Sequence, residues 1–245
     1  MIPARRTFGP LAGPAAKRVT VPDGDRYTLR VTLTADDAER RARERVQEGL
    51  QRPRDIHTAD IETARLVWIP LWRVDAEIDG RHLGLRALSD AKGRLRGVLP
   101  TGGEVHHHEV GVVLARALLP VDPSSAVTLD AHDLLPWASH PAREGELVEP
   151  DVARDEAEHT VATRLRRRVI PGRALYADVE VRVRSAAMVF LPVWLRRYRY
   201  EGEAARAGGE ECHVALHAGT GAVVSERHPA GWRAVAGRLR GLWKR

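Results

Sequence analysis

The chain has 245 residues, 43% of them hydrophobic, a composition that is ordinary for a globular protein. Its 39 Lys and Arg residues exceed its 33 Asp and Glu residues, which gives a net charge of +6. A single cysteine, Cys212, excludes an internal disulfide and a CxxC zinc framework. The chain has no apolar run near the ~20 residues of a spanning helix and no signal-peptide core. We therefore expect a cytoplasmic protein.

The first expected elements are a hairpin and a helix. Residues 19–33 alternate apolar and polar side chains on both sides of Pro22-Asp23-Gly24, which is typical of a short hairpin. Thr34, followed three residues later by Asp37, forms a capping box and predicts a helix over residues 34–50. The buried stripe of this helix is expected to hold Ala38, Ala42, Val46 and Leu50.

A fifteen-residue block then occurs twice, as LVWIPLWRVDAEIDG at 66–80 and as MVFLPVWLRRYRYEG at 188–202. The two copies align without a gap. In the first copy Trp72, Val74, Ala76 and Ile78 alternate with polar residues, which predicts a half-buried antiparallel strand with Trp72 inward. We expect Gly80 to turn that strand. The aromatic residues and prolines are expected to be structural anchors: Trp68, Pro70, Trp72, Phe190, Pro192 and Trp194.

The remaining elements repeat this order. Residues 83–88 and 94–99 predict a hairpin, and a helix over 150–168 is expected to bury Val152, Ala157, Val161 and Leu165. Residues 175–183 alternate as a strand that leads into the second block. A last hairpin is expected around Gly219-Thr220-Gly221.

Each half therefore combines a helix with antiparallel strands, which predicts an α+β fold. We expect a tandem duplication of one helix-plus-antiparallel-sheet unit, with the two copies packed about a pseudo-twofold axis. The expected divisions are a flexible arm at 1–18, a first unit at 19–120, a connector at 121–148, a second unit at 149–230 and a basic amphipathic C-terminal helix at 231–245.

The paired blocks resemble a bacterial family whose members carry two YxPxW blocks. The match continues through Tyr198, Tyr200, Gly202, Gly219-Thr220-Gly221 and Pro229. Some members are labelled zinc-ribbon or PriA-like helicase proteins, and their phage-shock-type genomic neighbourhood implies a role in envelope stress. Members often add a zinc ribbon and membrane helices, which are missing from this sequence. The sequence also lacks the GxxxxGK(S/T) motif that a helicase would need.

The C-terminal segment 231–245 is the strongest candidate for a contact element. On a helix its Trp and Leu residues face away from its basic residues, which suits the surface of an anionic membrane. The alternatives are a terminal helix docked on the protein itself and contact with a protein or a nucleic acid. The candidate contact residues are Trp232, Arg233, Val235, Arg238, Leu239, Arg240, Leu242, Trp243, Lys244 and Arg245.

Histidines and arginines supply weaker candidates. His106 and His108 would share one face of a strand and could begin a metal site, to which His132 or His140 could add; the alternative is a polar loop. Residues 164–168 hold four arginines, which either complement the helix dipole or contact phosphate. Arginines and tyrosines at 196–200 either stack bases or take opposite faces of a strand.

The sequence shows no catalytic spacing and implies no cofactor. We expect a non-enzymatic scaffold or adaptor that binds a protein partner or an anionic membrane surface, peripherally at the inner membrane in the second case. The first alternative is a nucleic-acid-binding module that uses the Arg-rich faces. The second is a metal-dependent enzyme centred on the histidines. The sequence does not indicate an oligomeric state.

Overall fold

The computed structural model describes residues 8–17, 19–47, 60–89, 92, 94–137, 144–170, 174–201 and 209–229. These residues form two α-helices on one mixed sheet, so the expected α+β class is confirmed, with sheet predominating. The helices are α1 (Ala35–Gln47), α2 (Arg154–Val169) and the short 3-10 turns η1 (Asp23–Asp25) and η3 (Ala131–Asp133). The strands are β1 (Arg26–Thr28), β2 (Asp60–Ile61), β3 (Arg65–Ser89), β4 (Leu95–Leu114), β5 (Leu135–Pro136), β6 (Glu146–Leu147), β7 (Ala174–Tyr200), β8 (Glu210–His217) and β9 (Val223–Arg227).

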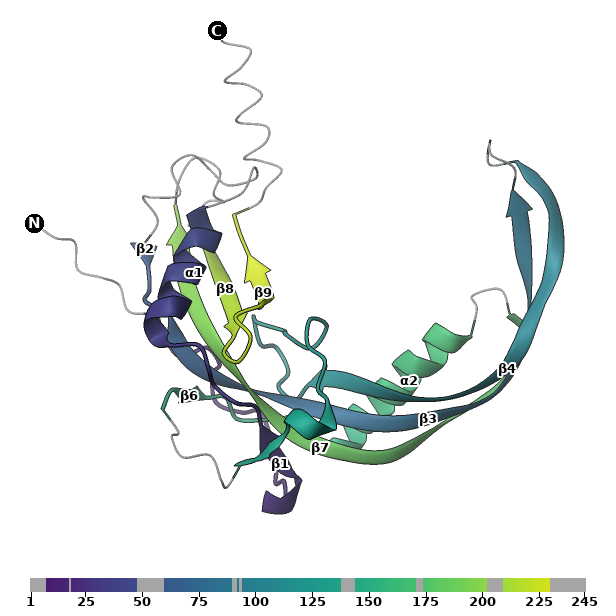
Figure 1. Cartoon of the computed structure of the whole chain (residues 1–245), viewed down its shortest axis with the longest axis horizontal. Helices are drawn as coiled ribbons and strands as arrows, with labels where there is room; N and C mark the ends of the chain where they lie inside the picture. Colours follow the sequence, from purple (N-terminus) through teal and green to yellow (C-terminus); the bar gives the residue numbers. More distant parts are fainter. Residues whose placement is uncertain are drawn as a thin grey trace, which may run out of the picture.

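Two long antiparallel strands, β3 and β7, form the centre of the sheet. At one end β8 pairs with β7, and β9 pairs with β8; we call this end, together with α1, the body end. At the other end β4 extends the sheet beside β3. Figure 1 shows a strongly curved sheet whose far end rises as an extension, with α2 on the concave side of the sheet. We call this extension the wing and define it as residues 76–89, 95–109 and 174–183.

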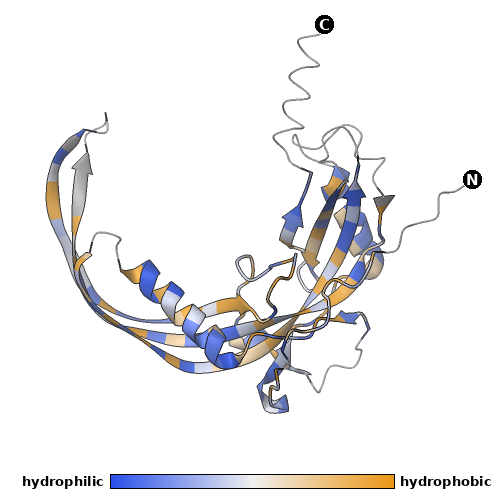
Figure 2. Ribbon diagram, turned by 180° about the vertical axis from the view of Figure 1, so that it is seen from behind, coloured by the Kyte–Doolittle hydropathy of each residue, from blue (hydrophilic) through white to orange (hydrophobic). Residues whose placement is uncertain are grey.

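The alternation of side chains separates two packed faces of the central strands, and this striping is visible along the ribbons in Figure 2. The even-numbered face lies under both helices: Trp72, Val74, Ala76 and Ile78 pack with Val161 and Leu165, and Tyr198 and Tyr200 pack with Ala38, Ala42 and Val46. The odd-numbered face carries Val67, Ile69, Leu71, Val189, Leu191 and Val193. It is covered by Leu11, Leu29, Val121, Leu129 and Val148.

Helix α1 begins where its capping signal predicts. The backbone N–H of Asp37 donates to Thr34 Oγ1 at 3.2 Å, and the Thr34 hydroxyl donates to Asp37 Oδ2 at 3.0 Å. Ala38, Ala42 and Val46 are buried as expected, and Leu50 lies outside the described residues. Helix α2 likewise buries Ala157, Val161 and Leu165, although it begins at Arg154 and not at residue 150.

Two local predictions are wrong. Residues 19–33 do not form a hairpin, because Pro22 leads into η1 and β1 then pairs with β7 and β5. Gly80 does not turn its strand but lies within β3, with a φ of +149°. A Cβ at Gly80 would lie 2.1 Å from the carbonyl oxygen of Asp178. The glycine therefore allows β7 to pass close beside β3.

The start of the chain packs more closely than a flexible arm would. The backbone N–H of Leu11 donates to Glu146 Oε1 at 2.7 Å. The Arg116 guanidinium donates to the carbonyl oxygens of Gly13 and Pro14 at 2.6 and 2.9 Å. These contacts hold residues 8–14 across the odd-numbered face, while residues 1–7 lie outside the described part of the chain.

Candidate functional site

The two repeated blocks pair with each other at the centre of the sheet. Ile69 lies opposite Leu191, Trp68 lies opposite Pro192, and Pro70 lies opposite Phe190. Ile69 and Leu191 are also equivalent positions in the two aligned blocks. The pairing therefore places equivalent residues symmetrically about a local twofold axis at this pair.

Pro70 has a defined structural role in the first block. Ala115 donates its N–H to the carbonyl oxygen of Pro70 at 2.9 Å, but Pro70 has no N–H to return. The carbonyl oxygen of Ala115 instead accepts the N–H groups of Asp151 and Val152 at 2.9 and 3.1 Å. The missing donor thus frees a carbonyl that holds the residues leading into α2.

Pro192 makes the same arrangement in the second block. Ala218 donates to the carbonyl oxygen of Pro192 at 2.9 Å. The carbonyl oxygen of Ala218 then accepts the N–H groups of Thr32 and Leu33 at 3.0 and 2.8 Å. These two residues lead into α1, so each proline serves the entry of one helix.

The tryptophan of each block adds a second hydrogen bond to the residues that lead into the helix. We call the proline and tryptophan contacts of each block together a Pro-x-Trp dock. The indole N–H of Trp72 donates to the carbonyl oxygen of Val152 at 2.9 Å. The indole N–H of Trp194 donates to the carbonyl oxygen of Leu33 at 3.0 Å. In both blocks the proline and the tryptophan of the Pro-x-Trp pattern therefore hold the residues that lead into a helix.

The other two block aromatics, Trp68 and Phe190, meet a third ring. Trp137, from the segment between the repeats, lies edge-on to Trp68 with ring centroids 5.3 Å apart. Its ring also packs against Phe190 at 4.4 Å. One aromatic side chain thus fills the space between two equivalent positions.

The expected histidine pair lies on the convex face of the wing. His106 Nδ1 donates to Asp79, and His108 Nε2 lies 3.4 Å from Asp75 Oδ1. This hydrogen bond raises the pKa of His106 and lowers that of Asp79. His107 lies on the other face, 3.6 Å from Glu109. Strand alternation therefore separates the three histidines as expected.

The convex face continues as a ladder of opposite charges. Arg184 pairs with Glu77, and Arg182 pairs with Glu180 at 2.6 Å. The Ser185 hydroxyl donates to Asp75 Oδ2 at 2.9 Å. We call the residues of this surface the charge ladder: Asp75, Glu77, Asp79, His106, His108, Glu180, Arg182, Arg184 and Ser185. Its acidic and basic groups compensate each other along the convex face of the sheet.

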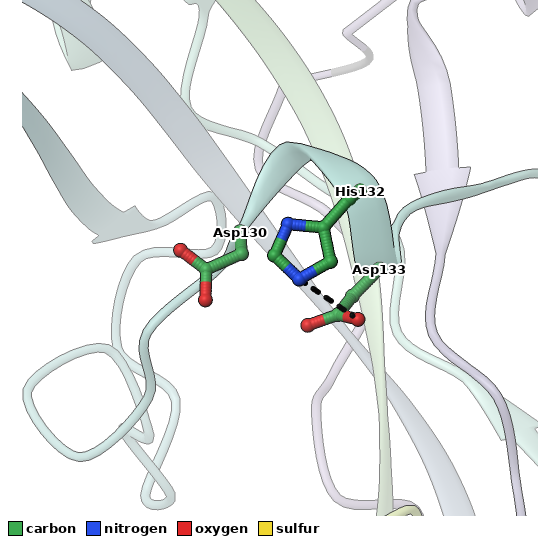
Figure 3. A group of neighbouring side chains, drawn as sticks. All are labelled: Asp130, His132 and Asp133. Carbon is green, nitrogen blue, oxygen red and sulfur yellow. Dashed lines mark ion pairs between the residues drawn. The ribbon is translucent and has the colours of Figure 1, made fainter.

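A possible set of metal ligands occurs elsewhere, at η3. Figure 3 shows Asp130, His132 and Asp133, whose ligand atoms all lie within 4.8 Å of one another. Within the described residues this is the one such group of three, and it contains neither His106 nor His108. All three side chains are exposed, and His132 already lies 3.5 Å from Asp133. His140 lies outside the described residues, so the predicted metal site remains a prediction.

The tyrosines at 198 and 200 are fully buried beneath α1, so neither ring face can stack on a base. Arg196, buried on the same face, lies 2.9 Å from Glu39 Oε1, and its burial lowers its pKa. Arg197, on the opposite face, pairs with Glu62 at 3.1 Å. These contacts give the arginines of this strand structural partners.

The arginines that end α2 divide into two kinds. Arg168 pairs with Glu109, and Arg164 donates to the carbonyl oxygen of Val112 at 3.3 Å. Arg166 and Arg167 are exposed and form no ion pair with the described residues. These two remain available to an anionic partner, while their position also complements the helix dipole.

A hydrogen-bonded network of titratable groups lies at the body end. His213 is buried, and its Nε2 shares a hydrogen bond with Ser225 Oγ at 3.0 Å. Burial lowers the pKa of His213 to about 4. Arg45 donates twice to Glu226, which lowers the pKa of Glu226 to about 2. Cys212 packs under α1, away from His213, so the two do not form a catalytic dyad.

A small cavity of about 260 Å³ lies beside the start of α2. Its lining is of mixed character: Lys17, Val19, Thr20, Val21, Pro22, Asp25, Trp72, Ala153 and Arg154. Arg154 is engaged by Glu158 and Asp25, at 2.8 and 3.8 Å. The groups that the cavity could offer to an anion are therefore Lys17 and the start of α2.

The far end of the wing exposes a cluster of apolar side chains that the sequence analysis missed. Leu83, Leu85, Val98 and Tyr176 are 47, 40, 51 and 49% exposed. Leu83 lies opposite Tyr176 on β7, and Leu85 lies opposite Pro100 on β4, so these residues share the convex face. We call them, with Pro100, the wing-tip patch. In the sequence, this patch could have been recognised from the change from charged residues to leucines at the odd-numbered positions of β3.

None of the helices in the described residues is long and apolar enough to cross a membrane. The basic segment 231–245 lies outside those residues, and its role remains a prediction. Comparisons of the chain with protein families, curated protein sequences and solved structures found no match. A function is therefore inferred from the surfaces of the described residues alone.

Proposed function

We propose that this protein is a non-enzymatic scaffold that binds a protein partner through the wing-tip patch. The observation that carries the proposal is the exposure of four large apolar side chains on one face of a projecting three-stranded sheet. Polar residues flank the patch toward the body, among them Arg81, Asp178 and Glu180. An apolar centre with a polar rim is the usual anatomy of a protein interface.

The wing is suited to this role because its folding does not require the patch. The concave side of the wing is anchored by α2 through Val74, Ala76 and Ile78. The patch lies on the opposite side and beyond the charge ladder. Its apolar residues therefore contribute little to the core, which favours a role in binding.

We also propose that the chain arose by tandem duplication of a helix-plus-sheet unit. The support is the agreement between the two Pro-x-Trp docks, which use equivalent residues for equivalent hydrogen bonds. Helix α1 contacts β7 and β8 of the second unit, and α2 contacts β3 and β4 of the first unit as well as β7 of its own unit. If the two blocks are equivalent, a variant in which residues 68–72 and 190–194 are exchanged should still unfold cooperatively. Loss of cooperative unfolding would contradict the equivalence of the two blocks.

The scaffold proposal is tested by comparing three tagged baits prepared from the full chain. The first is wild type, and the second carries Leu83→Ser, Leu85→Ser and Tyr176→Ser. The third, a control, carries Leu147→Ser, at a residue that is 48% exposed on β6. Quantitative mass spectrometry of proteins retained from the native host should show a partner that is lost with the triple variant and kept with the control. Equal retention by all three would refute binding through the patch.

A nucleic-acid-binding function is favoured by one observation: Arg166 and Arg167 on α2 are exposed and form no ion pair with the described residues. This function predicts steep salt dependence of binding to short DNA, and loss of binding in the double Arg→Ala variant. Absence of DNA binding at low salt would contradict the nucleic-acid-binding function.

Co-sedimentation of the full chain and residues 1–230 with anionic vesicles tests the separate prediction that 231–245 contacts an inner membrane.

A further inference from the structure

Strand β4 forms a long open edge of the sheet. Within the described residues it pairs with β3 and with no strand on its other side. The hydrogen bond from the N–H of Ala115 to the carbonyl oxygen of Pro70 shows which residues of β4 bond to β3, because hydrogen-bonded positions recur at every second residue. The odd-numbered residues of β4 therefore direct their N–H and C=O groups toward β3, and the even-numbered residues direct theirs to the open edge. The contact of Arg164 with the carbonyl oxygen of Val112 agrees with this assignment.

Open edges usually carry features that prevent pairing with another strand. Pro100 is such a feature, since it is even-numbered and its missing N–H would face the edge. From Gly102 to Val110, however, the edge contains no proline and no lysine. This stretch keeps a continuous register with β3, without a bulge. It is therefore competent to pair with another strand.

We propose that two copies of this chain pair through their β4 strands, antiparallel, about a twofold axis at Val105. The proposal rests on the role of the wing as the binding element of a scaffold, and it names a second copy as one partner of that element. With Val105 opposite itself, residues 96–114 of one copy lie along 114–96 of the other. The stretch 102–108 of one copy then pairs with 108–102 of the other, and Pro100 limits the paired stretch at each end.

Charge complementarity selects this register. Glu104 of one copy lies opposite His106 of the other, and the contact forms twice. Glu104 is exposed and has no ion pair with any described residue, although Arg81 lies across from it on β3. His106 uses Nδ1 for Asp79, which leaves Nε2 for a carboxylate on the other side. Both groups thus gain a partner of opposite charge.

Neighbouring registers are less complementary. An axis at residue 104 places Glu104 opposite Glu104. An axis at residue 106 sets Glu104 against His108 but places His106 opposite His106. An axis at residue 107 sets His106 against His108. The axis at Val105 therefore gives the best charge complementarity of these registers, because it pairs Glu104 with His106 twice and sets no like groups opposite each other.

Disulfide trapping tests the axis directly. Val105 is odd-numbered, so the two copies of it would form a non-hydrogen-bonded pair with Cα atoms about 4.5 Å apart, which is within disulfide range. The full-length Val105→Cys variant should form a disulfide-linked dimer on mild oxidation. Val110→Cys is the matched control, because its two copies would lie ten residues apart along the paired strands, at about 33 Å. The native Cys212 is buried.

Sedimentation equilibrium of the unmodified full chain supplies the second measurement. We expect a reversible dimer that Glu104→Lys weakens at least tenfold, because two positive groups then face each other. A monomer at all concentrations up to several hundred micromolar would overturn the proposal, as would equal trapping of Val105→Cys and Val110→Cys. The triple wing-tip variant should still dimerise. Partner capture and dimerisation are thus measured separately. Failure to capture a partner through the patch would contradict the scaffold proposal alone, and failure to dimerise would contradict the pairing of β4 strands alone.

Discussion

At the body end of the sheet, β7 and β8 form a short hairpin whose side chains are almost all buried beneath α1 and the start of the chain. At the wing end, β3 and β4 form a second hairpin, but β4 has 20 residues where β8 has 8. Both ends use the same Pro-x-Trp dock. The two ends therefore differ in the hairpin beside each dock: one hairpin completes the core, and the other extends beyond it and exposes both its edge and its apolar tip.

The largest effect should come from Gly80, where the wing joins the central sheet. Gly80→Ala introduces a Cβ that would meet the backbone of Asp178, in a conformation that alanine rarely adopts. We expect a loss of about 3 kcal/mol or more in the free energy of unfolding, measured by urea denaturation. Gly103→Ala is the control, because nothing lies within 4 Å of its added Cβ. Equal stability of both variants would show that the wing does not depend on this close approach.

The body end should respond to pH through His213, whose pKa is lowered to about 4 by burial. The unfolded chain, with a histidine pKa of about 6.5, binds this proton more readily, so stability falls as the pH drops from 6.5 toward 4. Between pH 6.5 and pH 5 the loss should be about 1.6 kcal/mol. Denaturation curves of the wild type and His213→Gln should differ in this slope. An unchanged slope would place His213 in contact with solvent.

The two docks provide the direct test of equivalence between the ends. Trp72→Phe and Trp194→Phe each keep most of the ring volume and remove one indole N–H, which leaves the carbonyl of Val152 or Leu33 without that donor. We expect each variant to lose about 1–2 kcal/mol in the free energy of unfolding. Similar losses would show that the two docks contribute equally to the free energy of unfolding. A loss at one end alone would show that only that dock stabilises its helix.

The smallest effect is expected at the wing tip. Leu83→Ser should change the free energy of unfolding by less than about 0.5 kcal/mol, since Leu83 is 47% exposed. The same substitution at the fully buried Ile78, on the other face of β3, is the control and should be strongly destabilising. If Leu83→Ser proved equally costly, the wing-tip patch would belong to the core and not to a binding surface.

Local signals predicted much of the local structure, although the hairpin expected at 19–33 and the turn expected at Gly80 were wrong. The alternation at 71–79 correctly separated Trp72 and Ile78 from the charged residues, because side chains of a strand alternate whatever their partners. The Thr34 capping box and the Gly219-Thr220-Gly221 turn, with Gly221 at a φ of +74°, were also recognisable. The C-terminal contact residues stay untested, since 231–245 lies outside the described residues.

Tertiary structure alone decided how the parts combine. The prolines indicated an interrupted ladder, but only the pairing of β3 with β7 shows which carbonyls they free and which helix each carbonyl holds. Gly80 was indistinguishable from a turn residue until its distance from Asp178 was known. The wing-tip patch likewise depends on which strands lie side by side and on which face α2 covers. Sequence periodicity determines the two faces of a strand, and long-range packing determines which of them is buried.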